Sequence, residues 1–146
     1  MALAAEPQFD DLYRDILLDH FRRPRNRGKL ASPTEHREGM NPVCGDEISI
    51  DLQLADHTIE DIAFEGVGCS ISQSSVSMMT ERLKGRSLEE ARDVAMKFEA
   101  MLVDGTKPDA SLGDLEALQG VAKFPVRVKC ALLGWKVLAA AISHQA

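Results

Sequence analysis

The amino-acid sequence predicts an α+β fold, in which a small antiparallel β-sheet of about three strands has helices packed on one face. Two observations support this class. Apolar and polar residues alternate strictly over residues 48–54, which is typical of a half-buried strand. After residue 69 the apolar residues instead recur at helical spacing. Because strands and helices that are separated along a chain form separate layers, this order favours helices on one face of an antiparallel sheet.

The first expected element is a helix over residues 9–21. Its apolar residues, which include Phe21, recur at helical spacing, and Asp10 or Asp11 can cap its first turn. The next segment, residues 22–29, is rich in arginine and is interrupted by proline and glycine. A solvated loop is the favoured interpretation of this run of positive charge, and a docking patch for an acidic partner is the alternative.

The expected strands include a central hairpin with a strong signal. Residues 48–54 and 59–65 form its two strands, with a short reversal between them. Ile59 and Ile62 fall on opposite faces of a regular strand, so a β-bulge is expected there. An earlier strand is expected within residues 31–38.

The second half of the chain is expected to be helical. Ser70 can cap a helix over residues 70–84, and a capping box at Ser87 opens the next helix. A short helix is expected at residues 112–118 and a last helix at residues 131–143. The four segments give the helical layer that the fold class requires.

The length and composition predict one domain spanning residues 1–146. The formal net charge of −6 argues against a general nucleic-acid binder, because such a protein needs a basic face to neutralise phosphates. No run approaches the roughly 20 apolar residues of a membrane span, so no membrane partner is expected. The N-terminus lacks the basic start and apolar stretch of a signal peptide, so a cytoplasmic location is expected.

The cysteines Cys44, Cys69 and Cys130 fall at junctions of the predicted elements. An odd number of cysteines cannot all pair within the chain, and a reducing compartment would keep them as thiols. The residues alone leave two interpretations open, because isolated cysteines are either small buried side chains or metal ligands. Together with Asp46, the three thiolates could complete a tetrahedral shell around Zn²⁺.

Two basic residues, Arg127 and Lys129, precede Cys130 closely. Together they could offset the net charge of about −2 that four anionic ligands around a divalent metal would carry. Their alternate positions predict that both face the same side. They are therefore candidates for supporting the metal site or contacting a partner.

Three segments around the cysteines, residues 41–46, 64–72 and 127–130, resemble the cysteine motifs of the U-type iron–sulfur cluster assembly family, which includes IscU and the N-terminal part of NifU. The likeness also covers the segments Leu12–Tyr13, Pro24–Asn26 and Leu118–Val121. The resemblance implies a SufE/IscU-like α+β fold. It also implies that the three cysteines are metal ligands and that Asp46 lies near or on the metal.

Two features point to the SufU branch of that family. Scaffold members usually have histidine before the third cysteine, where this chain has Lys129, and residues 101–118 are similar to an insertion that marks the SufU branch. Members of that branch are understood as zinc-dependent, sulfurtransferase-like sulfur acceptors. The resemblance implies that Cys44 takes persulfide sulfur from a SufS-type cysteine desulfurase and passes it to a SufBCD-type assembly complex, with Zn²⁺ as the cofactor.

Two other functions remain open at this point. A scaffold would assemble a transient [2Fe–2S] cluster on the same cysteines, because thiolates suit iron–sulfur clusters equally well. A structural zinc module would only mediate protein contacts. The histidines are interpreted as surface or packing residues rather than ligands; they are His20, His36, His57 and His144.

Overall fold

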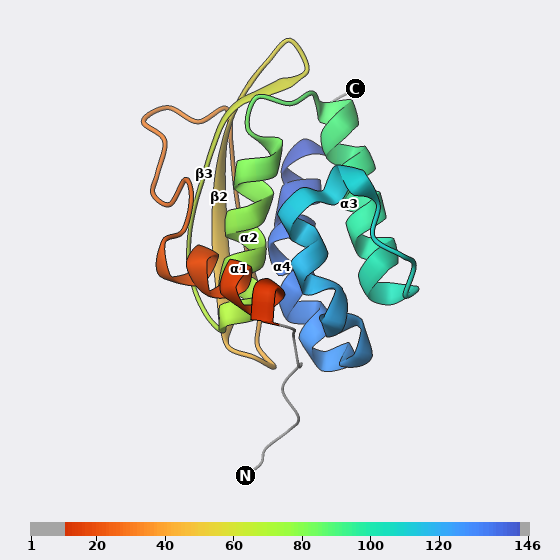
Figure 1. Cartoon of the computed structure of the whole chain (residues 1–146). Coiled ribbons are helices and arrows are strands. Elements are labelled where there is room, and N and C mark those ends of the chain that lie inside the picture. Colours follow the sequence, from red (N-terminus) through yellow and green to blue (C-terminus); the bar gives the residue numbers. More distant parts are fainter. Residues whose placement is uncertain (1–10, 144–146) are drawn as a thin grey trace.

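The computed structural model describes residues 11–143, and Figure 1 shows a β-sheet with helices packed on one of its faces. The sheet has three antiparallel strands in the order β1-β2-β3. The predicted α+β class is therefore confirmed. The first two residues of the predicted N-terminal helix, residue 9 and Asp10, and also His144 lie outside the described residues.

The central strand of the sheet is β2 (Asp46–Ala55), which pairs with β1 (Glu35–Asn41) on one side and β3 (Thr58–Val67) on the other. The predicted bulge is confirmed, because the register between β2 and β3 shifts at Gln53/Leu54 and leaves Glu60 as an extra residue. This extra residue lets Ile59 and Ile62, on the same strand, both be buried.

The first strand lies later than the predicted residues 31–38. It is an edge strand of mostly polar residues without an apolar alternation, so its own sequence marks its limits poorly. Pairing with β2 sets its position instead, from Glu35 opposite Leu52 to Asn41 opposite Asp46.

The helices form two layers over the sheet (Figure 1). The inner layer packs the apolar face of the sheet, and a stack of Phe98 on Trp135, with ring centroids 4.9 Å apart, joins it to the outer layer. None of the helices in the described part of the chain is long and apolar enough to cross a lipid bilayer. The helical elements are α1 (Asp11–Arg22), α2 (Ser70–Leu83), α3 (Leu88–Val103), η1 (Ala110–Lys123) and α4 (Pro125–Ile142).

The two inner helices, α2 and α4, approach each other closely. Ser75 Oγ donates a hydrogen bond to the Ala131 carbonyl at 2.6 Å, and a Cβ at Gly134 would lie only 2.9 Å from Val76. Small side chains on both helices therefore permit this contact. The close packing fixes the beginnings of α2 and α4 relative to the sheet.

Four details of the helices differ from the predictions. The N-cap of α2 is Cys69 rather than Ser70, and Phe21 is 42% exposed because α1 ends at the surface of the helical layer. The helix expected at residues 112–118 is part of the longer η1, which is kinked at Gly113. The last helix begins six residues early, at Pro125.

The capping box at Ser87 is present in part. The N–H of Glu90 donates to Ser87 Oγ at 3.0 Å, so Ser87 is the N-cap of α3 as predicted. The Glu90 carboxylate pairs with Arg82 at 2.9 Å.

Candidate metal centre

Three junctions of the fold meet at one end of the sheet. The β1–β2 turn carries Cys44, the junction of β3 and α2 carries Cys69, and the second turn of α4 carries Cys130. Figure 1 shows this turn and the beginnings of α2 and α4 at the same end of the molecule. The three cysteine-bearing junctions are therefore brought to one end of the sheet.

The β1–β2 turn is held in place by Asn41, whose side chain is buried. The N–H of Cys44 donates to the Asn41 carbonyl, and the N–H of Val43 donates to Asn41 Oδ1, both at 3.2 Å. Gly45 follows with φ of +71°, a left-handed conformation that favours glycine. Cys44 therefore lies on a fixed turn and is partly open to solvent.

The carboxylate of Asp46 is fully buried at the beginning of β2. Its Oδ1 accepts a hydrogen bond from the N–H of Cys69 at 2.9 Å, and its Oδ2 lies 4.0 Å from Cys69 Sγ. Gly68 makes room for this contact, because its φ is +151° and a Cβ there would overlap Asp46 Oδ1. Asp46 is thus fixed against the N-terminus of α2.

The most deeply buried thiol is that of Cys130. Its Sγ lies 2.7 Å from Cys44 Sγ, which is too long for a disulfide bond of about 2.05 Å, and 3.8 Å from Asn41 Nδ2. Burial raises the pKa of the Cys130 thiol, and its neighbours Cys44, Cys69 and Asp46 raise it further. A thiol in such surroundings needs a nearby cation to ionise at neutral pH.

The helix predicted at residues 131–143 implied that Cys130 lies at a helix N-terminus. The structure contradicts this, because Cys130 lies within α4. Proline is favourable at the first helical position, where no N–H bond is required, so α4 begins at Pro125. The Cys130 Sγ consequently lies 3.8 Å from the Val126 carbonyl oxygen, away from the free N–H groups. Cys69 does occupy a helix N-terminus, as the N-cap of α2.

The donor atoms at this end of the sheet suit a metal ion. One ligand atom each from Cys44, Asp46 and Cys130 lie within 4.8 Å of one another. Cys69 is outside this set and adjoins it through Asp46. Three thiols with one carboxylate match the tetrahedral, sulfur-rich sites of Zn²⁺, whereas Ca²⁺ and Mg²⁺ prefer oxygen shells. The buried thiol of Cys130, which a cation would ionise, also fits zinc.

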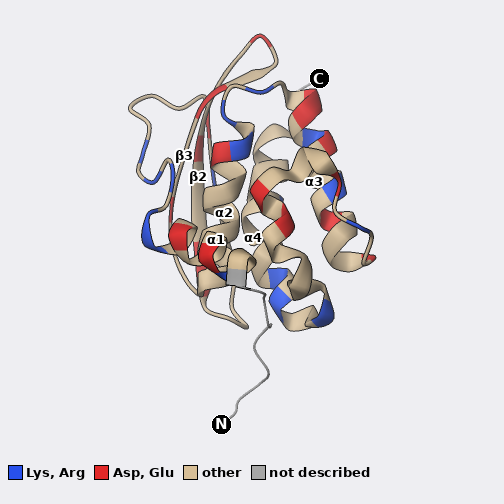
Figure 2. Ribbon diagram, in the orientation of Figure 1, with Lys and Arg blue, Asp and Glu red and all other residues tan. Residues whose placement is uncertain are grey.

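The two basic residues near Cys130 do not share a face of α4, contrary to the prediction. Arg127 and Lys129 are two positions apart in a helix, and such residues point in different directions. Arg127 is half-buried and Lys129 is exposed. Figure 2 shows Lys and Arg where α4 begins, so this segment brings positive charge to the end of the molecule that carries the thiols.

Large apolar side chains are exposed in the segments that carry the thiols. Met40 and Val43 belong to β1 and its turn, Val67 ends β3, and Val126 opens α4; each of the four is more than half exposed. A group of exposed apolar side chains around a site indicates a surface for protein contact. The thiols therefore lie within a candidate docking surface.

Two residues position the site although the sequence did not identify them as functional. Asn41 holds the Cys44 turn and approaches Cys130, and Gly68 admits the Asp46 carboxylate. The only signal for either was its place inside a cysteine motif.

Comparison with known proteins defines the class. The model of the NifU-like N-terminal domain family matches residues 12–145, and the chain belongs to this family. The chain is similar to the zinc-dependent sulfurtransferase SufU of Bacillus subtilis, with 45% identity over 93% of this chain and 92% of the relative. It is also similar to the iron–sulfur cluster assembly scaffold protein IscU of Streptococcus pyogenes, with 43% identity over 95% of this chain and 87% of the relative.

A solved structure supports the same family fold. A crystal structure from Fervidobacterium islandicum, named for iron–sulfur cluster assembly in the SUF system, superposes with a TM-score of 0.82 at 33% identity. The match covers 88% of this chain and 94% of that one. The resemblance drawn from the cysteine motifs is thus confirmed at the level of the family.

Proposed function

We propose that this chain is an iron–sulfur cluster assembly protein that accepts sulfur on Cys44 from a SufS-type cysteine desulfurase and delivers it to a SufBCD-type assembly complex. The observation that carries the proposal is the difference between the thiols. Cys44 is on a glycine-flanked, partly exposed turn, whereas Cys130 is buried beneath it. A group that transfers sulfur between proteins must be reachable, and Cys44 meets that requirement.

Cys44, Asp46, Cys69 and Cys130 are the proposed zinc ligands. Zinc, when bound, would keep the thiols deprotonated and order the three segments that carry them. The Oδ1 of Asp46 accepts the hydrogen bond from the N–H of Cys69. Its Oδ2 is therefore the oxygen that is free to bind the metal beside the thiols. Asn41 holds the turn in the position that brings Cys44 over Cys130.

The proposed transfer is a thiol–persulfide exchange. The Cys44 thiolate attacks the terminal sulfur of the desulfurase persulfide, and a new S–S bond forms on Cys44. The original S–S bond breaks, and its electron pair leaves with the desulfurase cysteine as a thiolate. The proton of the persulfide stays with the transferred sulfur. No external oxidant or reductant is needed, because one S–S bond replaces another.

The surface around Cys44 supports docking of a protein partner. Exposed Met40, Val43 and Val126 offer apolar contacts, and Lys129 adds positive charge on α4. Arg127, in the first turn of α4, is proposed to support the site from a half-buried position. Such a mixed surface suits a partner with an apolar, acidic contact region.

The test is the stimulation of a SufS-type desulfurase, measured as sulfide release, together with mass spectrometry of the acceptor. Cys44→Ala is expected to abolish both stimulation and persulfide formation. Met96→Ala removes an exposed apolar side chain of α3, outside the proposed docking surface, and is expected to retain both. Full stimulation by Cys44→Ala would exclude the proposed role of Cys44.

The scaffold function is the second candidate, and the IscU relative at 43% identity favours it. The cysteine ligands would then hold a [2Fe–2S] cluster as cargo. Anaerobic reconstitution with iron and sulfide separates the two, since a scaffold gains a cluster absorption spectrum and transfers the cluster to an apo-ferredoxin. A structural zinc module would do neither, and would unfold when zinc is removed without ever carrying a persulfide.

A further inference from the structure

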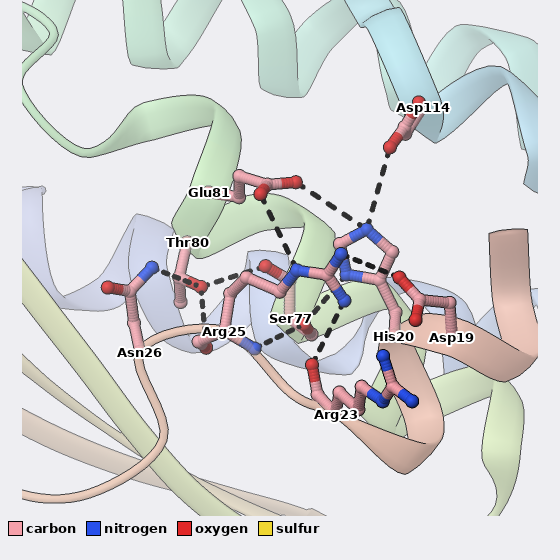
Figure 3. A network of polar contacts seen from close by, with 9 residues as sticks. All are labelled: Asp19, His20, Arg23, Arg25, Asn26, Ser77, Thr80, Glu81 and Asp114. Atoms are coloured by element: carbon pink, nitrogen blue, oxygen red, sulfur yellow. Dashed lines mark hydrogen bonds and ion pairs between the residues drawn. The ribbon is translucent and has the colours of Figure 1, made fainter.

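A second cluster of metal-binding side chains lies among the helices, apart from the cysteines. It consists of His20 from α1, Glu81 from the last turn of α2 and Asp114 from η1, which we call the histidine–carboxylate cluster. One ligand atom from each residue lies within 4.8 Å of the other two. Figure 3 shows both carboxylates directed at the same ring nitrogen of His20.

That ring nitrogen is unusual because it is buried without a hydrogen bond. His20 is 1% exposed, and its Nε2 has no hydrogen-bond partner. Glu81 Oε1 and Asp114 Oδ2 lie at 3.5 and 3.6 Å from Nε2, beyond the usual hydrogen-bond length of about 2.7–3.2 Å. Buried polar atoms are usually paired, so this nitrogen is available to bind a further partner.

The same distances fit ligands that share a metal ion. Neighbouring ligands of a tetrahedral zinc ion are about 3.4 Å apart when each bond is about 2.1 Å long. The separations of 3.5 and 3.6 Å are therefore close to those expected around one Zn²⁺. Imidazole with carboxylates is a donor set that suits zinc, whereas Mg²⁺ and Ca²⁺ favour oxygen ligands alone.

The other ring nitrogen is already held as metal-bound histidines require. His20 Nδ1 lies 2.8 Å from Ser77 Oγ, which also accepts a hydrogen bond from the N–H of Arg25 at 2.9 Å. When Nδ1 carries the proton and donates it to Ser77, the lone pair of Nε2 points between the two carboxylates. Figure 3 shows this arrangement, with Ser77 and the carboxylates on different sides of the ring.

The local charge and space also favour a divalent cation. Arg25 pairs with Asp19 at 2.6 Å and with Glu81 Oε2 at 3.5 Å, which leaves Oε1 directed at His20. Three carboxylates and one guanidinium, with a neutral imidazole, give the group a net charge of −2. Glu81 and Asp114 also line a surface hollow of about 190 Å³, which has room for water ligands.

We propose that His20 Nε2, Glu81 and Asp114 form a second divalent-cation site, chemically suited to Zn²⁺ and separate from the cysteine site. Water completes the coordination from the hollow beside the two carboxylates. The ion links α1, α2 and η1, and so fastens the N-terminal helix to the helical layer. His20 is then a ligand rather than the packing residue that the sequence suggested.

The test is calorimetric titration of ZnCl₂ into the full chain that already holds one equivalent of zinc. The wild-type protein is expected to bind a further equivalent. Asp114→Asn and Glu81→Gln each replace an exposed carboxylate and are expected to weaken that event by at least about tenfold. Asp104→Asn, at the exposed C-cap of α3, is the matched control and should bind like the wild type.

Histidine-detected ¹⁵N NMR of the wild-type protein supplies a measurement that needs no variant. The Nε2 resonance of His20 is expected to move to the position of a metal-bound nitrogen during the second zinc addition. The proposal would be overturned if the His20 resonance does not change, or if the ring stays doubly protonated when zinc is added. It would also be overturned if Asp114→Asn binds the second zinc ion with the same affinity as the wild type. The first two outcomes would leave His20 as a structural residue in ion pairs with the carboxylates.

Discussion

The helix α2 takes part in two different clusters, one at each end. Cys69 caps its N-terminus beside Asp46, and Glu81 lies in its last turn beside His20, about 18 Å away along the helix at 1.5 Å per residue. The first cluster is sulfur-rich and is built from turns and element ends. The second is built from side chains of three helical elements.

This difference teaches how each cluster can act. Cys44 lies on a turn that is open on one side, so it can leave its neighbours and meet a partner without unpacking the core. His20 is enclosed between helices, and moving it would separate α1 from α2. The proposed sulfur transfer therefore suits the cysteine cluster, and a stabilising role suits the histidine–carboxylate cluster.

The largest effect is expected from Asp46→Ala in the cysteine cluster. The change removes a proposed zinc ligand and the buried Asp46 carboxylate, and it leaves the N–H of Cys69 without its acceptor. The free energy of unfolding should fall by about 3 kcal/mol. Zinc affinity should fall by more than about tenfold. Metal analysis and urea unfolding measure the two quantities.

Asp51→Ala is the matched control, because Asp51 is another buried carboxylate of β2, bonded to the N–H of Leu30 and to His36. It should lose stability but keep its zinc. Normal zinc binding by Asp46→Ala would show that the cysteine cluster does not use this carboxylate.

A second prediction concerns the space for Asp46. Both Gly68 and Gly105 have a positive φ, which strains any residue with a Cβ. A Cβ at Gly68 would overlap Asp46 Oδ1, whereas a Cβ at Gly105 would have no atom within 4 Å. Both variants pay for backbone strain, but only the first collides with the site. Gly68→Ala should therefore be about 2 kcal/mol less stable than Gly105→Ala in thermal unfolding. Equal stabilities would mean that the Asp46 carboxylate moves freely.

The third prediction tests the histidine–carboxylate cluster as a stabilising site. At a free zinc concentration tenfold above its dissociation constant, a second bound ion should add about 1.4 kcal/mol to the free energy of unfolding. Glu81→Gln should lose this increment while keeping the effect of the first ion. If the melting temperature of Glu81→Gln rises with zinc as much as that of the wild type, the histidine–carboxylate cluster is not a stabilising zinc site.

The smallest effect is expected at His36, whose ring nitrogens are both hydrogen-bonded, unlike those of His20. Nδ1 lies 2.5 Å from Asp51 and Nε2 lies 2.9 Å from Glu38, and the bond to Asp51, followed by that to Glu38, raises the pKa of His36. Its contribution to stability is therefore complete below about pH 6.5 and is lost as the pH rises through the raised pKa.

His36→Asn should consequently lower the free energy of unfolding, measured by urea denaturation, more at about pH 6 than at about pH 9. The difference should be less than about 1 kcal/mol because His36 is half exposed. A larger loss for His36→Asn at high pH than at low pH would contradict the assigned ion pairs.

Much of the fold was predictable from local patterns. The alternation along residues 48–54 predicted β2, the mismatch of Ile59 and Ile62 predicted the bulge, and Ser87 predicted the beginning of α3. Each signal lies within a few residues of the feature that it produces. The predictions failed where the outcome depended on a distant partner, as at β1, which is positioned by pairing with β2.

The sequence by itself determined the chemistry available at the cysteine cluster and the family to which the chain belongs. The motifs around Cys44, Cys69 and Cys130 predicted both, because thiol reactivity and motif spacing are properties of the chain. The tertiary structure decided which thiol is open and which is buried, since the depth of Cys130 depends on where α4 packs.

Only the tertiary structure brought His20, Glu81 and Asp114 together. These residues come from three elements and share no motif, so no local pattern connects them. Helix packing buried the ring of His20 and left one nitrogen facing two carboxylates. Burial is set by the whole fold, and it turns an ordinary histidine into a candidate ligand.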